Sequence, residues 1–560
     1  MQKVFQPKLF KTINKAYWRI QFSKDLMSGI IVGIVALPLA IAFGIASGVS
    51  PQQGLITAFI AGFIISFLGG SHVQIGGPTG AFIIIIYGIV TQYGMSGLII
   101  ATVLAGAMLI IMGLLRLGNV IKFIPYPIIV GFTSGIAVVI FSSQIKDFFG
   151  LQVSGVPSEF VDKWVFYFQN IDTLNWWALS VGVATILIIS FWSKITKRIP
   201  GSLIAIVVLT VVVLLLKRFW DIELETIGSR FPELAGGSPL PQPETPKIDM
   251  AAIKMLIQPA FTIAMLGAIE SLLSAMVADG ATGKRHHSNT ELIAQGIANV
   301  TVPFFGGIPA TGAIARTMTN INNGGKTPVA GIIHAVFLFL IYLFLMPLAV
   351  HIPMACLGGI LVMIAYNMSE WRSFKALLRN PRADVAVLLT TFFLTVIFDL
   401  TIAIEIGLLM AILLFLKRVT ETSGISVLDV EVKNSENDEN TDAEVLNVPK
   451  GVEVYEIDGP FFFGIANKFD EFDDAVQKKI SVRIIRMRKV PFIDSTGIHN
   501  LRNLCKRSQK EKIKVILSGV TTGVFETLKK SGFNEEIGEE FICSHISIAL
   551  EKAREIMKTQ

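Results

Sequence analysis

Two short stretches rich in glycine, proline and threonine interrupt the long apolar runs of this 560-residue chain. The first contains Pro78-Thr79-Gly80-Ala81 and the second Pro309-Ala310-Thr311-Gly312-Ala313, and each follows a Phe-x-Gly-Gly sequence. Each stretch opens an unusually short apolar segment, which is typical of a helix that begins near the middle of a membrane. The start of such a helix has unpaired backbone N–H groups and a positive dipole end. Two of these starts facing each other would bind an anion with little help from side chains.

The chemistry of the side chains in these two stretches indicates which residues would contact the anion. Gly80 and Gly312 would let the anion approach the backbone, and the hydroxyls of Thr79 and Thr311 could donate hydrogen bonds. The same small residues could instead serve only to pack helices closely in lipid. Their matching positions in the two halves of the chain favour the binding site. The complete set of predicted anion-binding residues is Thr79, Gly80, Ala81, Thr311, Gly312, Ala313 and Arg316.

Glu270 is a carboxylate in the middle of an apolar segment. Placing it in the bilayer costs at least about 2.5 kcal/mol, so we expect it to act in binding or coupling. Ser274 lies one helical turn further along the same face. The two residues could hold a coupling cation, or Glu270 could carry a proton. Alternatively, Arg316 neutralises Glu270 at rest, and this arginine could also turn toward the anion.

Other ionisable residues lie closer to the ends of the apolar segments. The residues predicted to be interfacial or solvated are Asp279, Glu291, Asp399, Glu405 and the pair His286-His287. The three cysteines, Cys356, Cys505 and Cys543, have no metal-like spacing and form no disulfide framework. The membrane part contains neither a nucleophile elbow nor a phosphate-binding loop. We therefore predict no metal, no cofactor and no enzymatic activity.

Fourteen apolar segments must position these residues. Hydrophobic residues make up 52% of the chain and charged residues only 16%, against about a quarter in a soluble protein. Several segments are shorter than the roughly 20 residues of a full membrane crossing. The segments are 30–48, 53–68, 78–93, 97–115, 121–143, 174–193, 202–216, 258–278, 291–302, 311–322, 327–346, 355–368, 385–396 and 402–416.

The distribution of Lys and Arg indicates how the segments are oriented. Basic residues gather near the N-terminus and in alternate loops, which the positive-inside rule places in the cytoplasm. This arrangement explains the net charge of +6 without nucleic acid as a partner. The even count predicts a multi-pass protein of the inner or plasma membrane with both termini cytoplasmic. Because each half has seven segments, the second half is inverted relative to the first.

The chain divides into a cytoplasmic N-terminal segment (1–27), a membrane domain (28–418), an acidic linker (419–450) and a soluble domain (451–560). In the soluble domain, predicted strands alternate with predicted helices, which indicates a small α/β fold. The strands are expected at 452–457, 483–487 and 515–517, and the helices at 466–476, 496–509, 524–530 and 546–557. The sequence Asp494-Ser495-Thr496-Gly497 lies where a helix would begin, and helix capping explains its residue types. A phosphate on Ser495 would also be stabilised by the helix dipole, so Ser495 is a candidate regulatory phosphorylation site.

Several of these sequences together resemble the SulP sulfate permease family. They are Val35-Ala36-Leu37-Pro38-Leu39-Ala40, Gly76-Gly77-Pro78-Thr79-Gly80, Glu270-Ser271-Leu272-Leu273 and Gly306-Gly307-Ile308-Pro309-Ala310-Thr311-Gly312-Ala313-Ile314-Ala315-Arg316. The loop 494–497 is similar to the signature of STAS domains. The resemblance implies an α-helical membrane protein with fourteen spans in two inverted repeats, in which spans 1–4 and 8–11 form a core and the others a gate. It also implies a cytoplasmic STAS domain, an anion held between the third and tenth spans, elevator-like movement of the core, and a homodimer.

Two positions differ from the pattern of this family. Some proton-coupled members have a glutamate after the proline of the first span, where this chain has Leu39, so coupling would fall to Glu270. Sodium-coupled bicarbonate members have a hydroxyl on the tenth span, where this chain has Ile314, which cannot ligate sodium. Arg316 suits a doubly charged oxyanion such as sulfate, because a guanidinium offers paired donors in one plane.

We therefore predict secondary active transport of a small inorganic anion, sulfate, coupled to protons rather than to sodium. The nearest alternative is a bicarbonate symporter or a chloride/bicarbonate exchanger on the same scaffold. An anion channel, or a sensor that signals through the STAS domain, is a further alternative. The expected partners are the anion, the coupling cation, membrane lipid, a second copy of the chain and a cytoplasmic protein at the STAS domain.

Overall fold

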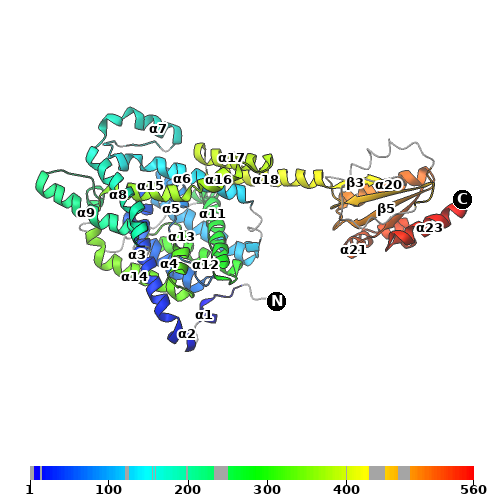
Figure 1. Ribbon diagram of the computed structural model, residues 1–560, viewed down its shortest axis with the longest axis horizontal. Coiled ribbons are helices and arrows are strands. Elements are labelled where there is room, and N and C mark those ends of the chain that lie inside the picture. Colours follow the sequence, from blue (N-terminus) through cyan, green and yellow to red (C-terminus); the bar gives the residue numbers. More distant parts are fainter. Residues whose placement is uncertain are drawn as a thin grey trace. The chain divides into compact units, whose positions relative to one another are not determined.

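The computed structural model of the protein describes residues 5–12, 15–119, 125–153, 155–157, 159–196, 200–232, 250–398, 400–427, 448–463 and 480–559. The chain forms two compact units, Met1–Leu409 and Met410–Gln560. The first unit is helical, and the second contains a β-sheet covered by helices (Figure 1). This confirms the predicted fold class, a helical membrane part followed by a small α/β domain.

Each of the fourteen predicted segments coincides with a helical stretch. The third and fourth are continuous as η1 (Gly80–Phe82) and α5 (Ile83–Leu114), with a break at Gly94, where φ is 66°. The other helices are α3 (Phe22–Ala46), α4 (Pro51–Leu68), α6 (Tyr126–Phe149), α8 (Trp176–Ile195), α9 (Gly201–Trp220), α11 (Met250–Thr282), α12 (Ser288–Thr301), α13 (Ile314–Asn322), α14 (Pro328–Ala349), α15 (Met354–Met368), α17 (Arg382–Ile397) and α18 (Leu400–Thr422). Among the described residues, seven helical stretches are long and apolar enough to cross a membrane. The number of crossings stays a prediction.

The helices of the first unit fall into two packing groups. The core helices α3, α4, α5, α11, α12, α13 and α14 pack mainly on one another. The gate helices α6, α8, α9, α15 and α17 form the second group. This division matches the core and gate implied by the family resemblance.

Close packing among the core helices depends on small residues, as is common for helices in lipid. Helices α5 and α12 touch where Gly106 faces Gly296. A Cβ added at Gly106 would lie 2.7 Å from the Gly296 carbonyl oxygen, and a Cβ at Gly296 would lie 2.6 Å from the Gly106 carbonyl oxygen. This contact brings α12, which leads into the second glycine-rich stretch, against the helix that follows the first stretch.

Two of the segments that connect core helices to gate helices are hydrogen-bonded to each other through their backbones. One follows α9 and contains the short helix α10 (Ile227–Arg230), and the other joins α14 to α15. Ile227 N donates to Ile352 O at 3.0 Å, and Gly228 N donates to Val350 O at 2.7 Å.

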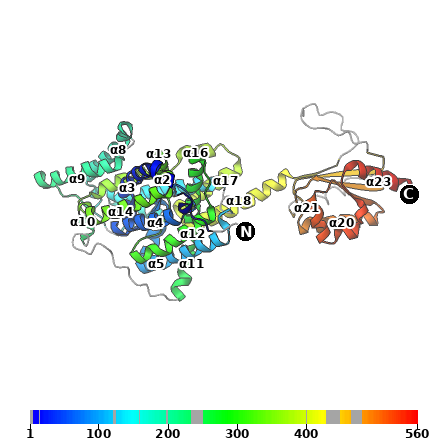
Figure 2. The ribbon, with the colours of Figure 1, turned by 90° about the horizontal axis from the view of Figure 1, so that it is seen from below.

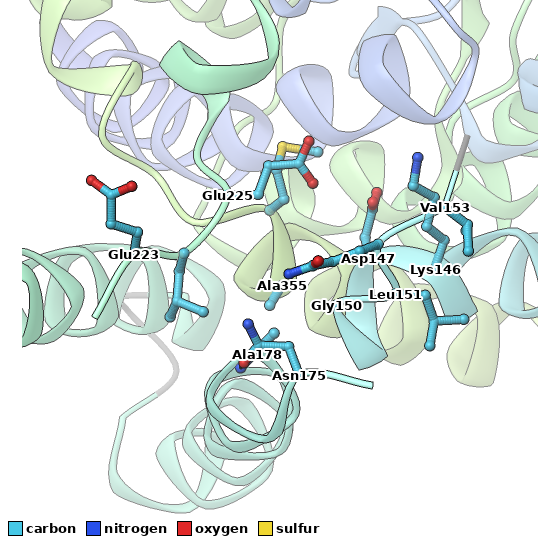
Figure 3. A pocket seen from close by; sticks show the side chains of 13 residues that line it. Lys146, Asp147, Gly150, Leu151, Val153, Asn175, Ala178, Glu223, Glu225 and Ala355 are labelled. Carbon is cyan, nitrogen blue, oxygen red and sulfur yellow. The ribbon is translucent and has the colours of Figure 1, made fainter. Parts of the chain in front are cut away.

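Arg230 fastens these paired connections to the gate helix α6. Its guanidinium donates two hydrogen bonds to Asp147, at 2.6 and 3.1 Å, and two to Glu225, at 2.5 and 2.8 Å. Asp147 and Glu225 also line a cavity of about 420 Å³ beside the connections (Figure 3). Arg230 therefore links the connection after α9 to α6 directly, and the connection between α14 and α15 is joined to it through the backbone hydrogen bonds.

The second unit has a five-stranded sheet in the order β3-β4-β5-β6-β7, with β3 antiparallel to β4 and the other neighbours parallel. The strands are β3 (Gly424–Val427), β4 (Val452–Asp458), β5 (Val482–Lys489), β6 (Lys514–Ser518) and β7 (Ile542–Cys543). Helices α20 (Ser495–Lys510), α21 (Thr522–Lys530) and α22 (Phe533–Ile537) pack on one face, and α23 (Ile546–Thr559) packs on the other (Figure 2).

Three predicted strands and three predicted helices of this unit are thereby confirmed, and the predicted helix 466–476 lies outside the described residues. Residues 424–427, which we assigned to the linker, instead form the edge strand β3. A β-strand of only four residues gives little periodicity, so the sequence did not reveal it.

Candidate functional site

The two glycine-rich stretches meet as a short antiparallel pair of strands. Strand β1 (Gly76–Gly77) pairs with β2 (Thr311–Gly312), with Gly76 opposite Gly312 and Gly77 opposite Thr311. The helix after β1 begins at Gly80, and the helix after β2 begins at Ile314, and neither start has a side-chain cap. The structure thus brings the predicted residues 79–81 and 311–313 together. The two helix starts leave backbone N–H groups without partners inside their helices.

Three side chains that the sequence pattern does not single out hold these stretches in place. Asn299 bonds Ala310 in both directions, from Nδ2 to Ala310 O at 2.8 Å and from Ala310 N to Oδ1 at 2.9 Å. Ile75 N donates to the Thr317 hydroxyl at 3.1 Å, and Asn320 Nδ2 donates to Val73 O at 2.8 Å. Irregular backbone inside a membrane needs partners of this kind, because lipid offers none.

One face of α11 receives side chains from both stretches. The Thr79 hydroxyl donates to Glu270 Oε2 at 2.9 Å, and the Thr311 hydroxyl donates to Gly267 O at 2.9 Å. Ser274, one turn beyond Glu270, donates to the Thr317 hydroxyl at 3.3 Å. Both threonine hydroxyls therefore donate to α11 in this structure, and their donation to an anion stays a prediction.

Arg316 lies at the junction of the two stretches and is 1% exposed. Its Nη2 donates to the Pro78 carbonyl oxygen, and its Nη1 has no hydrogen-bond partner among the described residues. A Cβ added at Gly77 would lie 2.2 Å from Nη1, so the guanidinium is packed directly against β1. The alternative in which Arg316 neutralises Glu270 at rest is not seen, because Glu270 bonds Thr79 and no ion pair joins the two described side chains.

Two predictions about charges are wrong. Glu291, predicted to be interfacial, is fully buried and accepts hydrogen bonds from Gly70 N at 2.8 Å and Ser71 N at 3.1 Å. It therefore satisfies the backbone where α4 ends. His286, predicted to be solvated, has a side chain that is 3% exposed, and its Nδ1 lies 2.7 Å from Asp279 Oδ2. Glu405 is exposed, and Asp399 lies outside the described residues.

In the second unit, α20 begins at Ser495, as the sequence predicts. The cap is Asp494, whose carboxylate accepts a hydrogen bond from Gly497 N at 2.7 Å. Ser495 occupies the first helical position and is exposed. Its phosphorylation stays a prediction.

Comparison with known proteins identifies both units. Residues 22–391 match the model of the sulfate permease family, and residues 445–553 match that of the STAS domain. "Putative sulfate transporter YvdB" of Bacillus subtilis is 42% identical over 95% of this chain and 98% of its own length. "Bicarbonate transporter BicA" of Synechocystis sp. is 30% identical over 92% of this chain and 91% of its own length.

Among solved structures, murine Slc26a9, an anion transporter in the inward-facing state, superposes with a TM-score of 0.85 at 20% identity, over 98% of this chain and 93% of that one. At this identity the match establishes the fold. The family consists of transporters rather than enzymes. The chain therefore belongs to the sulfate permease family of multi-pass membrane anion transporters and ends in a STAS domain.

Proposed function

We propose that this protein carries out secondary active transport of sulfate, coupled to protons through Glu270. The observation that carries the proposal is the pairing of β1 with β2, which places two uncapped helix starts beside the buried guanidinium of Arg316. These groups would bind the anion through backbone N–H groups of residues 79–81 and 311–313 and through Arg316. The 42% identity to YvdB supports sulfate as the substrate.

The charges at the site favour a dianion together with a proton. Each helix start carries about half a positive charge and Arg316 carries a full one, so the site holds about two positive charges when Glu270 is protonated. Ionisation of Glu270 lowers this to about one. Sulfate matches the first state and a monovalent anion matches the second. Binding of sulfate therefore favours protonation of Glu270, which is the requirement for symport.

Thr79 supplies a second link between the proton and the anion. A hydroxyl has one proton to donate, and in this structure Thr79 donates it to Glu270. When an anion takes that hydrogen bond, the Glu270 carboxylate loses its donor and its protonated form is favoured. The proton on Glu270 and the anion at the helix starts then enter together. Ser274 bonds Thr317 rather than Glu270, so a cation site that uses Ser274 would have to break that bond.

We also propose that the core helices move as an elevator against the gate helices and carry the anion with them. The separate packing of the two helix groups supports this motion. We place the protein in the inner or plasma membrane with both termini cytoplasmic, on the distribution of basic residues. From the family resemblance we also propose that two copies of the chain form a homodimer.

Bicarbonate is the second candidate substrate, because BicA is 30% identical over nearly the same length. Ile314 opposes the sodium-coupled version of this function, since its exposed side chain stands at the start of α13 and offers no oxygen ligand. A channel or a sensor differs from both candidates in that neither accumulates an anion against its gradient.

The test is uptake of labelled sulfate into proteoliposomes of the purified full chain, with and without an inward proton gradient. We expect saturable accumulation that requires the gradient and is lost in Glu270→Gln. No sulfate uptake in intact vesicles would overturn the sulfate assignment. Accumulation of bicarbonate to the level expected for sulfate, without a proton gradient, would favour bicarbonate as the substrate.

A further inference from the structure

Gln74 is a buried carboxamide two residues before β1, and the anion site described above does not use it. Its side chain is 3% exposed, and Nε2 donates to Ser271 O at 3.1 Å. A carbonyl oxygen can only accept, so the nitrogen end of the amide must face Ser271. Gln74 thus joins the segment that leads into the first helix start to the residue that follows Glu270.

The same amide is wedged against the second stretch. A Cβ added at Gly312 would lie 1.6 Å from Gln74 Nε2 and 2.7 Å from Gln74 Cδ. Only a glycine leaves room for the carboxamide at this point. Gln74 therefore contacts β2 as well as α11, although it belongs to the first stretch.

Gln74 and Thr311 hold α11 at two points that are one turn apart. Thr311 bonds the carbonyl of Gly267, Gln74 bonds the carbonyl of Ser271, and these carbonyls lie on one face of the helix. Glu270 lies between the two anchor points. Together the anchors fix the rotation of α11 that directs the Glu270 carboxylate to Thr79.

We infer that Gln74 is a positioning residue for proton coupling, which holds Glu270 within reach of Thr79. The inference rests on the proposed role of Glu270. With Gln74 removed, α11 keeps the hydrogen bonds of Thr311 to Gly267 and of Ser274 to Thr317, but it loses the one next to Glu270, so the helix can shift at that position. A displacement of about 1 Å is enough to break a hydrogen bond of ordinary length. Anion binding at the helix starts would persist, and its link to the proton would weaken.

The test compares two activities of the full chain in proteoliposomes, gradient-driven sulfate accumulation and sulfate self-exchange, which needs no net proton movement. Gln74→Met keeps the length of the side chain and removes its hydrogen bonding. We expect accumulation to fall about tenfold or more, which is typical of a small misplacement of reacting groups, and self-exchange to be retained. In the Glu270→Gln background, Gln74→Met should have no additional effect.

Asn320→Leu is the matched control, because Asn320 is also a fully buried carboxamide and bonds Val73, the neighbour of Gln74. A change there should not separate the two activities. Gln74→Leu, which fills a similar space, carries no charge and cannot donate to Ser271, serves as the second variant if Gln74→Met does not fold. Failure of both to fold would overturn the inference, because Gln74 would then be required for the fold itself.

The outcomes separate this inference from the proposed function. If Glu270→Gln accumulates sulfate as the unmodified protein does, the proposed coupling role of Glu270 fails. If Glu270→Gln loses accumulation while Gln74→Met keeps it, only the inference about Gln74 fails. Equal loss of both activities in Gln74→Met and Asn320→Leu would also overturn it, since that result describes a general packing defect.

Discussion

The Thr79 hydroxyl donates a hydrogen bond to the carboxylate of Glu270, 191 positions later in the chain, at 2.9 Å. This bond joins the start of the first broken helix to the acidic residue of α11. Arg316 has no carboxylate partner in the described part of the chain, and its guanidinium lies against β1. The acid and the base of the site are therefore kept apart, as the proposed binding of a proton by Glu270 and of an anion by Arg316 requires.

Replacing Thr79 tests this bond. Thr79→Val keeps the shape of the side chain and removes the hydroxyl, so an anion loses a donor that would be worth about 1.5–3 kcal/mol to a charged group. We expect the sulfate concentration at half-maximal uptake to rise about tenfold or more. Thr79→Ser keeps the hydroxyl and should stay close to the unmodified protein. Equal uptake by the valine and serine variants would contradict a role for the hydroxyl.

Arg316 should decide between divalent and monovalent anions. Arg316→Gln removes one positive charge, so the site would hold about one positive charge with Glu270 protonated and match a monovalent anion better than sulfate. We expect sulfate uptake to fall at least about tenfold, and chloride to compete more strongly for what remains. The measurement is inhibition of labelled sulfate uptake by sulfate and by chloride. Arg379→Gln, at an exposed loop arginine, is the control, and an unchanged ratio of the two inhibitors in Arg316→Gln would contradict the charge argument.

Gly312 should not tolerate a side chain. Its added Cβ would lie 1.6 Å from Gln74 Nε2, and overpacking of this kind costs about 1–3 kcal/mol. Gly312→Ala should therefore unfold at a lower temperature in detergent and lose uptake. Gly88 in α5 has no atom within 4 Å of its added Cβ, so Gly88→Ala is the matched control and should be neutral or stabilising. A melting temperature for Gly312→Ala equal to that of the control would contradict the packing seen here.

Loss of the Arg230 ion pairs should lower stability and transport rate more than loss of the nearby exposed pair of Lys217 with Glu223. Arg230→Gln leaves Asp147 and Glu225 without their shared donor and releases the paired connections from α6. We expect a lower melting temperature and a slower maximal rate of sulfate uptake, with sulfate affinity unchanged, because the anion site does not include Arg230. Lys217 pairs with Glu223 in the same connection but is exposed, and Lys217→Gln should change neither quantity. Equal melting temperatures and equal maximal rates for the two variants would contradict a role of the paired connections in transport.

The sequence predicts the helices and the broken helix starts well, because apolar length and Gly/Pro interruptions are local signals. It does not show in which direction a side chain points. A pair of Arg316 with Glu270 was an open alternative because the sequence places both charges in the same region, whereas the fold directs the first to Pro78 and the second to Thr79. Glu291 was misplaced for a related reason, since the backbone groups it satisfies at Gly70 and Ser71 lie 221 and 220 positions away.

Gln74 and Asn299 were missed because an isolated amide carries no pattern. Gln74 meets its partner 197 positions away, and only the meeting of β1 with β2 reveals the contact. One signal was available for Asn299, which lies 11 positions before Ala310 and is one of few amides in a short apolar segment. Polar residues in membrane segments are expensive, and this one could have been selected on that ground.

The cap of α20 gives the last prediction, in the STAS domain. Asp494 accepts the Gly497 N–H, and Ser495 makes no cap bond at the exposed first position of the helix. Asp494→Ala should therefore destabilise the start of α20 by about 1 kcal/mol and speed hydrogen exchange of its first amides about fivefold in the full chain. Ser495→Ala should leave that exchange unchanged, since the helix does not depend on this hydroxyl. Faster exchange in Ser495→Ala would show that the serine is a structural cap, and a role for it as an accessible phosphorylation site would then lose its main support.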